Sequence, residues 1–256
     1  MLDLDPKPAT VGLFLATYLL IVVLYRWKTV TVWIAAAVLL ISGLLSPRQA
    51  FEAIDWNVVL LYFGMLFVSE VFLYSKMPDY LATRFASRAA DARTAMVVLC
   101  AFTGVLSIGL ENVAVVLLVA PIALSIARKC EVDPVPLFIG MAVSSNLQGA
   151  ATLIGDPPSM LLAGFAKLRF NDFFFLHGKP SIFFAVQAAA LASAGVLYAL
   201  FRKYRKPMPP IAREHYASLA PTVLVALLVL CLVLSSSVDH GIEWMSGLLC
   251  CVFGAL

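Results

Sequence analysis

Long apolar runs without a single charged residue alternate with short polar segments along the whole chain. A transmembrane helix needs about 20 mostly apolar residues to cross roughly 30 Å of hydrocarbon, and several runs reach that length while others fall short. The runs cover residues 8–25, 29–47, 56–69, 94–110, 112–127, 134–155, 180–201, 216–238 and 244–256. No alternating barrel pattern is present, so the runs predict an all-α polytopic membrane protein.

Composition supports the same class of protein. Of the 256 residues, 62% are hydrophobic and 13% are charged, and the mean hydropathy is +0.96. Soluble domains are about half apolar and a quarter charged, so an ordinary soluble protein is excluded. The net charge of +3 is too small to indicate a nucleic-acid partner. We expect the lipid bilayer as partner, in a multi-pass protein of the cytoplasmic (inner) membrane.

Motifs for enzyme chemistry are missing from the sequence. It contains no Ser-His-Asp or His-Glu-x-x-His arrangement, and its five cysteines lack Cys-x-x-Cys spacing. The cysteines are typical of apolar packing residues. We therefore expect no enzyme and no cofactor, apart from Na⁺ or H⁺ as a coupling ion.

The distribution of lysine and arginine predicts the topology. Thirteen of the eighteen lie in segments 26–28, 76–93, 128–129 and 202–213. Because basic residues prefer cytoplasmic loops, we expect these segments inside and residues 167–179 outside.

Residues 94–127 have basic flanks predicted on the same side of the membrane. Two full crossings would leave only about 17 residues for each, joined by a very tight turn. The middle holds Glu111 and Asn112, and an acid left in lipid costs about 2.5–3.5 kcal/mol. We predict a re-entrant helical hairpin whose polar tip is buried in protein. The alternative is a two-span hairpin with Glu111 in the outer headgroups.

Residues 134–166 form the second irregular apolar segment. Gly149, Gly155 and Asp156 followed by two prolines cannot lie in a continuous lipid-facing helix. We predict a discontinuous helix that runs from 134 to about 148 and again from about 157 to 166. Asp156 would be the N-cap of the second half. The alternative is a surface loop in which Asp156 is only a cap.

A broken helix facing a re-entrant hairpin is typical of secondary transporters near the bilayer midplane. Neutral side-chain oxygens suit a partly dehydrated Na⁺, and the carboxylates can bind a proton or balance a cation. The neutral donors are Asn112, Ser145, Asn146 and Thr152, and the carboxylates are Glu111 and Asp156. We expect any Na⁺ near Asn112, Ser145 and Asn146. The tip and the break should meet, because neither polar cluster is tolerable in lipid alone.

Six stretches of the chain carry a family resemblance. They are residues 54–56, 63–65, 110–113, 117–121, 145–146 and 151–158, the last reading Ala-Thr-Leu-Ile-Gly-Asp-Pro-Pro. Together they resemble the ion transporter superfamily, in particular its arsenite permease and sodium–proton antiporter branch, which is related to citrate and dicarboxylate transporters.

The resemblance implies an inverted-repeat carrier in which the hairpin tip and the helix break form half of the ion and substrate site. The matching positions are Glu111 and Asn112 at the tip, and Ser145, Asn146, Thr152, Gly155 and Asp156 at the break. Gln148 stands where the family usually has glycine, and Glu111 where it usually has aspartate.

The same pattern divides the chain into three parts. Residues 1–201 would be the first repeat, 202–217 a cytoplasmic linker, and 218–256 the first helices of an incomplete second repeat. A second hairpin and a second broken helix are missing from the sequence. We expect either a truncated chain or one completed by a second half-transporter or by a homo-oligomer.

Three functions remain open at this stage. The first is a secondary active permease for a small ionic substrate, moving an inorganic or organic anion or exchanging Na⁺ and H⁺. The second is a truncated or structural membrane subunit that needs a partner chain, and the third is an intramembrane enzyme. Ion-gradient-dependent flux in vesicles separates the first from the others.

Overall fold

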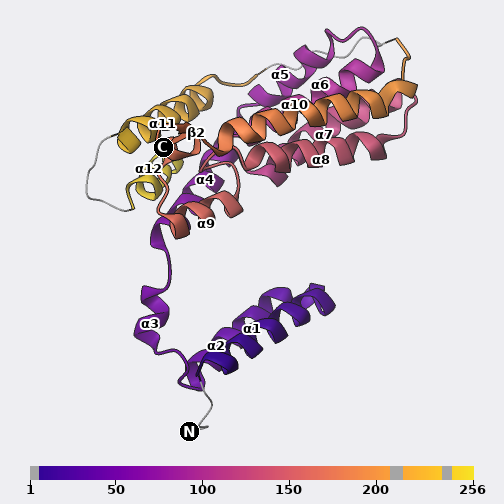
Figure 1. The fold of residues 1–256 in the computed structure, drawn as a ribbon. Helices are drawn as coiled ribbons and strands as arrows, with labels where there is room; N and C mark the ends of the chain where they lie inside the picture. The colour runs from indigo at the N-terminus through magenta and orange to yellow at the C-terminus, as the bar shows by residue number, and fades with distance from the viewer. Residues whose placement is uncertain (1–5, 208–215, 238–243) are drawn as a thin grey trace. The chain divides into compact units, whose positions relative to one another are not determined.

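A computed structural model describes residues 6–207, 216–237 and 244–256, which are almost wholly helical (Figure 1). The prediction of an all-α chain is therefore confirmed. Part of the predicted linker, 208–215, lies outside the described residues. The chain divides into two compact units, residues 1–55 and 56–256. Four described helical segments are long and apolar enough to cross a membrane: Trp56–Tyr74, Asn112–Lys129, Ile182–Lys203 and Ala220–Ser237.

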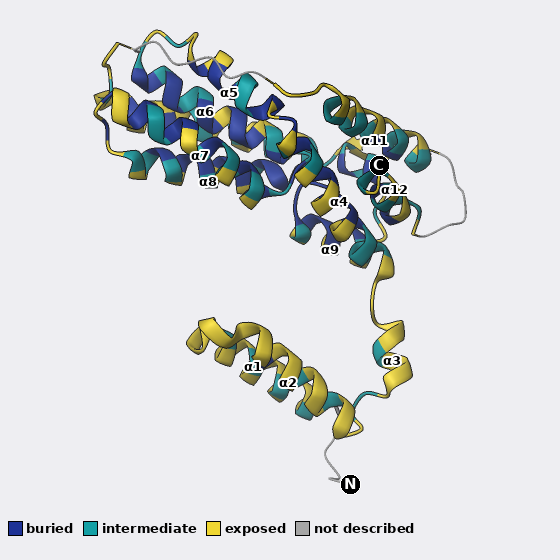
Figure 2. Ribbon diagram, turned by 180° about the vertical axis from the view of Figure 1, so that it is seen from behind, coloured by how far each residue is buried: buried dark blue, intermediate teal, exposed yellow. Residues whose placement is uncertain are grey.

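The first unit consists of apolar helices with little core of their own. Its elements are α1 (Pro6–Val23), η1 (Tyr25–Trp27), α2 (Lys28–Ile41) and α3 (Pro47–Glu52). The chain bends by 114° between Pro8–Val23 and Tyr25–Ile41. Among its described residues only Thr31 is buried, and Figure 2 shows α1 and α2 exposed over most of their surface. Such exposed apolar helices suit contact with lipid.

The second unit contains the predicted hairpin and the predicted helix break. Its helices and strands are α4 (Trp56–Tyr74), α5 (Met77–Ala86), α6 (Ala92–Ser107), α7 (Asn112–Lys129), α8 (Pro134–Gly149), α9 (Pro157–Ala166), η2 (Phe170–Phe173), β1 (Phe175–Leu176), β2 (Lys179–Pro180), α10 (Ile182–Leu200), η3 (Phe201–Lys203), α11 (Ala220–Ser237) and α12 (Met245–Gly254). Strands β1 and β2 form a short antiparallel pair that the apolar pattern does not predict.

The predicted hairpin corresponds to α6 and α7, joined by a short turn at residues 108–111. Helix α7 alone is long enough to be a candidate span, whereas α6 is shorter. The re-entrant path stays a prediction, and so does its two-span alternative. The predicted interruption between α8 and α9 lies at residues 150–156.

Two hydrophobic clusters make up most of the core of the second unit. One joins α5, α6, α7 and α8 with Leu197 near the end of α10 and Phe201 at the start of η3. The other joins α4, α9, η2, α11 and α12 around residues such as Leu61 and Phe173. A small third cluster of Phe72, Leu110 and Val115 connects α4 with the turn between α6 and α7. The turn therefore lies where the two larger groups of helices meet.

Aspartate and glutamate side chains begin several of these helices. Asp91, Glu111, Asp133 and Asp156 accept hydrogen bonds from backbone N–H groups in the first turns of α6, α7, α8 and α9. Such caps satisfy N–H groups that have no partner inside the helix. At Asp91, outside the apolar run, the hydrogen bonds from Thr94 hold the pKa of the carboxyl below its ordinary value.

Helices α4 and α12 touch through small residues. A Cβ added to Gly247 would lie 2.7 Å from the carbonyl oxygen of Asn57, and one added to Gly254 would lie 2.9 Å from that of Gly64. Residue numbers rise together along both helices, so α12 runs parallel to α4. Both helices therefore begin at the same end of the pair.

Contacts between loops join segments that the charge distribution assigns to one side of the membrane. Lys206 Nζ lies 2.8 Å from Glu131 Oε2, and the Ala92 N–H donates to the carbonyl of Lys206 at 2.9 Å. The Lys206 ammonium lowers the pKa of Glu131. At the end predicted to be outside, Asn171 donates to the carbonyl of Val233 at 3.1 Å.

Candidate functional site

The hairpin tip and the helix break meet through a series of hydrogen bonds. The hydroxyls of Ser107 and Ser145 are 2.6 Å apart, and Ser145 Oγ also donates to the backbone carbonyl of Asn112 at 3.2 Å. Thr152 Oγ1 donates to the backbone carbonyl of Ile108. Ser107, Ser145 and Thr152 are all buried. Two polar segments far apart in the sequence thus satisfy each other's hydrogen-bonding needs.

Glycines allow this approach at the level of the backbone. A Cβ on Gly155 would collide with the carbonyl oxygen of Gly149 and would lie 2.8 Å from that of Ser107. A Cβ on Gly149 would lie 2.7 Å from Nδ2 of Asn112. The tip and the break could not come this close if either position carried a side chain.

Asn112 is the group at this junction whose hydrogen bonds are incomplete. Its Nδ2 donates to Asn146 Oδ1 over 3.4 Å, a long bond. Its Oδ1 is buried and has no hydrogen-bond partner within the described residues, and the residue as a whole is 7% exposed. Leaving a buried acceptor unsatisfied costs about 1–3 kcal/mol. A donor or a cation at this oxygen would remove that cost.

The two carboxylates of the site act as helix caps. Glu111 Oε2 accepts from the N–H of Ala114 at 2.7 Å, and Asp156 Oδ1 accepts from the N–H of Ser159 at 2.9 Å. Each negative charge therefore lies at the positive end of a helix dipole. The backbone N–H of Glu111 points to Ser69 Oγ of α4 at 3.4 Å.

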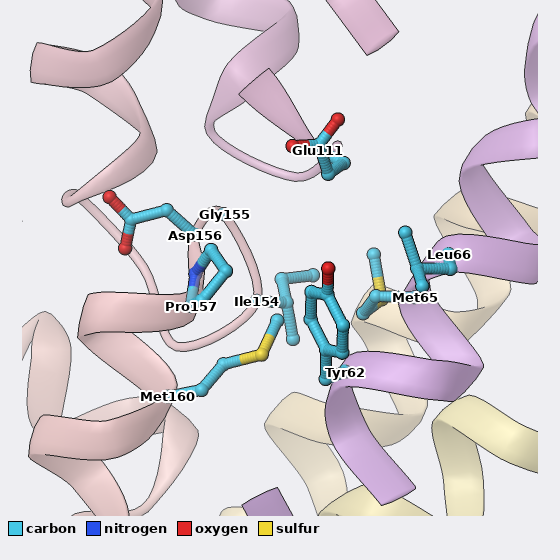
Figure 3. A pocket seen from close by; sticks show the side chains of 9 residues that line it. All are labelled: Tyr62, Met65, Leu66, Glu111, Ile154, Gly155, Asp156, Pro157 and Met160. Carbon is cyan, nitrogen blue, oxygen red and sulfur yellow. The ribbon is translucent and has the colours of Figure 1, made fainter. Parts of the chain in front are cut away.

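A small pocket opens beside the junction (Figure 3). Its lining comes from α4, the tip and the break: Tyr62, Met65, Leu66, Glu111, Ile154, Gly155, Asp156, Pro157 and Met160. Figure 3 shows the Tyr62 hydroxyl pointing toward the side on which Glu111 lies, whereas the Asp156 carboxylate is turned away from Tyr62. Glu111 is partly exposed and Asp156 is buried.

The structure thus brings all seven predicted site residues to one junction. Ser145, Thr152 and Gly155 lie in the contact itself, whereas Asn146 is exposed and reaches Asn112 only through the long amide contact. No described group of three His, Cys, Asp or Glu side chains could hold a metal ion. A cation here would depend on neutral oxygens, as in the predicted Na⁺ site.

Sequence reasoning missed three residues of this region and the partner of a fourth, Gln148. Tyr62 and Ser69 lie inside an apolar run that reads as an ordinary span, and Ser107 precedes the charged tip by only a few residues. Gln148 has a partner in α10, since Gln187 Nε2 donates to Gln148 Oε1 at 2.9 Å. Isolated polar residues in apolar runs were the available signal, but only the fold pairs them.

Comparisons with known proteins give concordant results. A family model described as "Citrate transporter" (CitMHS) matches residues 13–256. The magnetosome protein MamN of Magnetospirillum gryphiswaldense is 35% identical over 172 residues, which are 64% of this chain and 39% of that protein. The uncharacterized transporter Rv2685 of Mycobacterium tuberculosis is 33% identical over 177 residues, 67% of this chain and 41% of that protein.

A more distant match is the P protein of Sus scrofa, 32% identical over 135 residues, which are 52% of this chain and 16% of that protein. The chain spans about two fifths of the length of MamN and Rv2685. All of these matches cover a part of the relative and not its whole length.

Proposed function

Because the chain belongs to the citrate transporter family, we propose that it forms part of a secondary active transporter that moves a small ionic substrate across a membrane. The apolar helices and the family make it an integral membrane protein. We assign it to the cytoplasmic membrane, with Na⁺ or H⁺ as the coupling ion. The substrate would be an inorganic or organic anion, or the protein would exchange Na⁺ for H⁺.

The observation that carries this proposal is the buried Asn112 Oδ1 without a partner. Asn112 begins a helix at the junction of tip and break, with Ser145 and Asn146 beside it. Unwound carbonyls and the C-terminal ends of half-helices coordinate Na⁺ in secondary transporters. The Asn112 amide lies against Gly149, the last residue of α8, and so at such an end. A Na⁺ ion at this oxygen would satisfy the acceptor and would not require a carboxylate in the site.

Glu111 supports the alternative choice of coupling ion, H⁺. It is partly exposed and lines the pocket. Acidic residues inside membrane-spanning segments mark proton relays in pumps and transporters. Asp156 supports this role less well, because it is buried and turned away from Tyr62 (Figure 3).

Flux in proteoliposomes tests the proposal. Ion-gradient-driven uptake is measured over a panel of carboxylates and oxyanions, together with Na⁺/H⁺ exchange. Asn112→Ala should raise the Na⁺ concentration at half-maximal rate about tenfold or more while membrane insertion is unchanged. Asn171→Ala, which removes an amide bonded to α11 far from the tip, is the control. Wild-type Na⁺ dependence in Asn112→Ala would refute the cation site.

A second candidate is a membrane subunit that transports only with a partner. The chain spans about two fifths of the length of MamN and Rv2685. We propose that further protein, a second half-transporter or a second copy of this chain, completes the site at the junction. Native mass spectrometry tests this: assembly would support it, and monomers with full flux would refute it.

A further inference from the structure

Gln148 and Gln187 form a reciprocal pair of side-chain amides between α8 and α10. Gln187 Nε2 donates to Gln148 Oε1 at 2.9 Å, and Gln148 Nε2 donates to Gln187 Oε1 at 3.4 Å. Gln148 is 7% exposed. Alanines 188–190 follow Gln187 along α10. Only 6% of the apolar stretch of the candidate span that contains α10 is buried. An amide on such a helix needs a partner to be tolerated in lipid.

The path of Gln148 depends on a glycine in α6. A Cβ on Gly104 would lie 3.0 Å from Gln148 Cγ and 3.0 Å from the carbonyl oxygen of Ser144. The absence of a side chain at Gly104 therefore leaves room for Gln148 to pass beside α6 and reach α10. Three helices contribute to the arrangement, so it specifies how α8 and α10 pack.

Gln148 also belongs to the last turn before the helix break. Its backbone carbonyl accepts from the N–H of Ala151 at 3.0 Å. The next residue, Gly149, lies against the amide of Asn112 and against Gly155. A shift of Gln148 would therefore shift the backbone on which Asn112 and Gly155 depend.

We propose that Gln187 is a positioning residue, which through Gln148 holds the helix break in the arrangement that binds the coupling cation. The effect on cation binding rests on the proposed function, whereas the effect on the break does not. Neither glutamine touches the ion. Loss of the pair would let the last turn of α8 move and would reduce the fraction of molecules in the binding arrangement.

Hydrogen exchange of the full chain in nanodiscs without Na⁺ tests whether Gln187 holds the helix break in place. Gln187→Leu keeps the volume but leaves the Gln148 amide without its partner. Peptides covering residues 149–156 should exchange about fivefold faster, the ratio that about 1 kcal/mol gives. Ser193→Ala, which removes a polar atom from the same helix, should leave exchange unchanged. Unchanged exchange in Gln187→Leu would overturn the proposal.

The double variant Gln148→Leu/Gln187→Leu separates the pair from simple loss of packing. It removes both amides, so no buried amide remains unsatisfied. Exchange at residues 149–156 should return toward the wild-type rate, and the double-mutant cycle should show coupling. Strictly additive effects of the two substitutions would overturn the pair as the positioning unit.

The Na⁺ dependence of thermal stabilisation tests the effect on the ion, with choline as the control cation. Gln187→Leu should raise the Na⁺ concentration that gives half-maximal stabilisation about fivefold. The stabilisation at saturating Na⁺ should stay the same. If Asn112→Ala shifts the midpoint and Gln187→Leu does not, the positioning role is wrong. If neither wild type nor Asn112→Ala responds to Na⁺, the proposed cation site fails, and the exchange experiment still decides the positional effect.

Discussion

Helices α7 and α9 begin with the same local device in different surroundings. Glu111 caps the first and Asp156 caps the second, each through one backbone N–H. Glu111 is partly exposed beside the pocket, whereas Asp156 is 7% exposed. The comparison teaches that the same capping bond occurs at two degrees of burial, although both carboxylates line the pocket. A capping bond alone therefore does not tell which of the two carboxylates has a role beyond capping.

The close contact at Gly155, between the hairpin tip and the helix break, should be the contact most easily disrupted by substitution. Gly155→Ala would place a Cβ against the carbonyls of Gly149 and Ser107, so tip and break must separate. We expect a loss of about 3 kcal/mol of stability and no flux. Thermal unfolding in detergent measures the loss of stability, and proteoliposome uptake measures the flux.

Gly195→Ala is the matched control, because nothing lies within 4 Å of a Cβ at that position in α10. It should be neutral or slightly stabilising. Equal effects of the two substitutions would contradict the close approach of the backbones.

Removal of the more buried of the two capping carboxylates should cause the larger loss of stability. Asp156→Ala leaves a buried N–H without its acceptor and should cost about 2 kcal/mol, near the upper end for a cap. Glu111→Ala should cost about 1 kcal/mol, because Glu111 is less buried than Asp156. Unfolding midpoints of the two variants give the order, and a larger loss in Glu111→Ala would reverse our assignment.

Neutral isosteres should separate the two caps by their effect on pH dependence. Glu111→Gln should flatten the pH profile of flux, because it removes the carboxylate that we propose as the proton carrier. Asp156→Asn keeps a capping oxygen and should leave the profile unchanged. Flux measured between pH 5 and 9 tests both, and a changed profile in Asp156→Asn alone would exchange their roles.

Asp91 is a third helix cap, at the start of α6 outside the apolar run. Its substitution should have the smallest effect on stability. Its pKa is lower in the folded protein, so its contribution to stability is present above about pH 4. The contribution is lost as the pH falls through the lowered folded value. Asp91→Asn should reduce acid sensitivity below pH 4 and change stability at pH 7 by less than about 0.5 kcal/mol. A larger loss at pH 7 would show that Asp91 is not a solvent-side cap.

The all-α class was predictable, since charge-free runs and the glycine and proline positions depend on local chemistry. The capping role of Asp156 before Pro157 was predictable for the same reason. The cap at Glu111 was missed, because a glutamate in a polar turn reads equally well as a site carboxylate.

Contacts over long distances in sequence were not predictable from the pattern. Segment 76–93 reads as a charged loop, yet it contains α5, whose apolar face packs against α6 and α7. The Gln148–Gln187 pair joins residues that each look like an isolated polar side chain in an apolar run. Only the fold brings such partners together, because pairing depends on how helices pack and not on local periodicity.

The contact between α4 and α12 has a mechanical consequence. Gly64, Gly247 and Gly254 bring the two backbones together at successive turns, and the Cβ atoms of Leu60 and Phe67 lie directly against Gly247 and Gly254. Sliding by one turn, about 5.4 Å, would drive a helix backbone into the Cβ atoms of its neighbour. The axial position of the two helices is therefore fixed, and we expect α4 and α12 to move together as one rigid unit in any rearrangement of the protein.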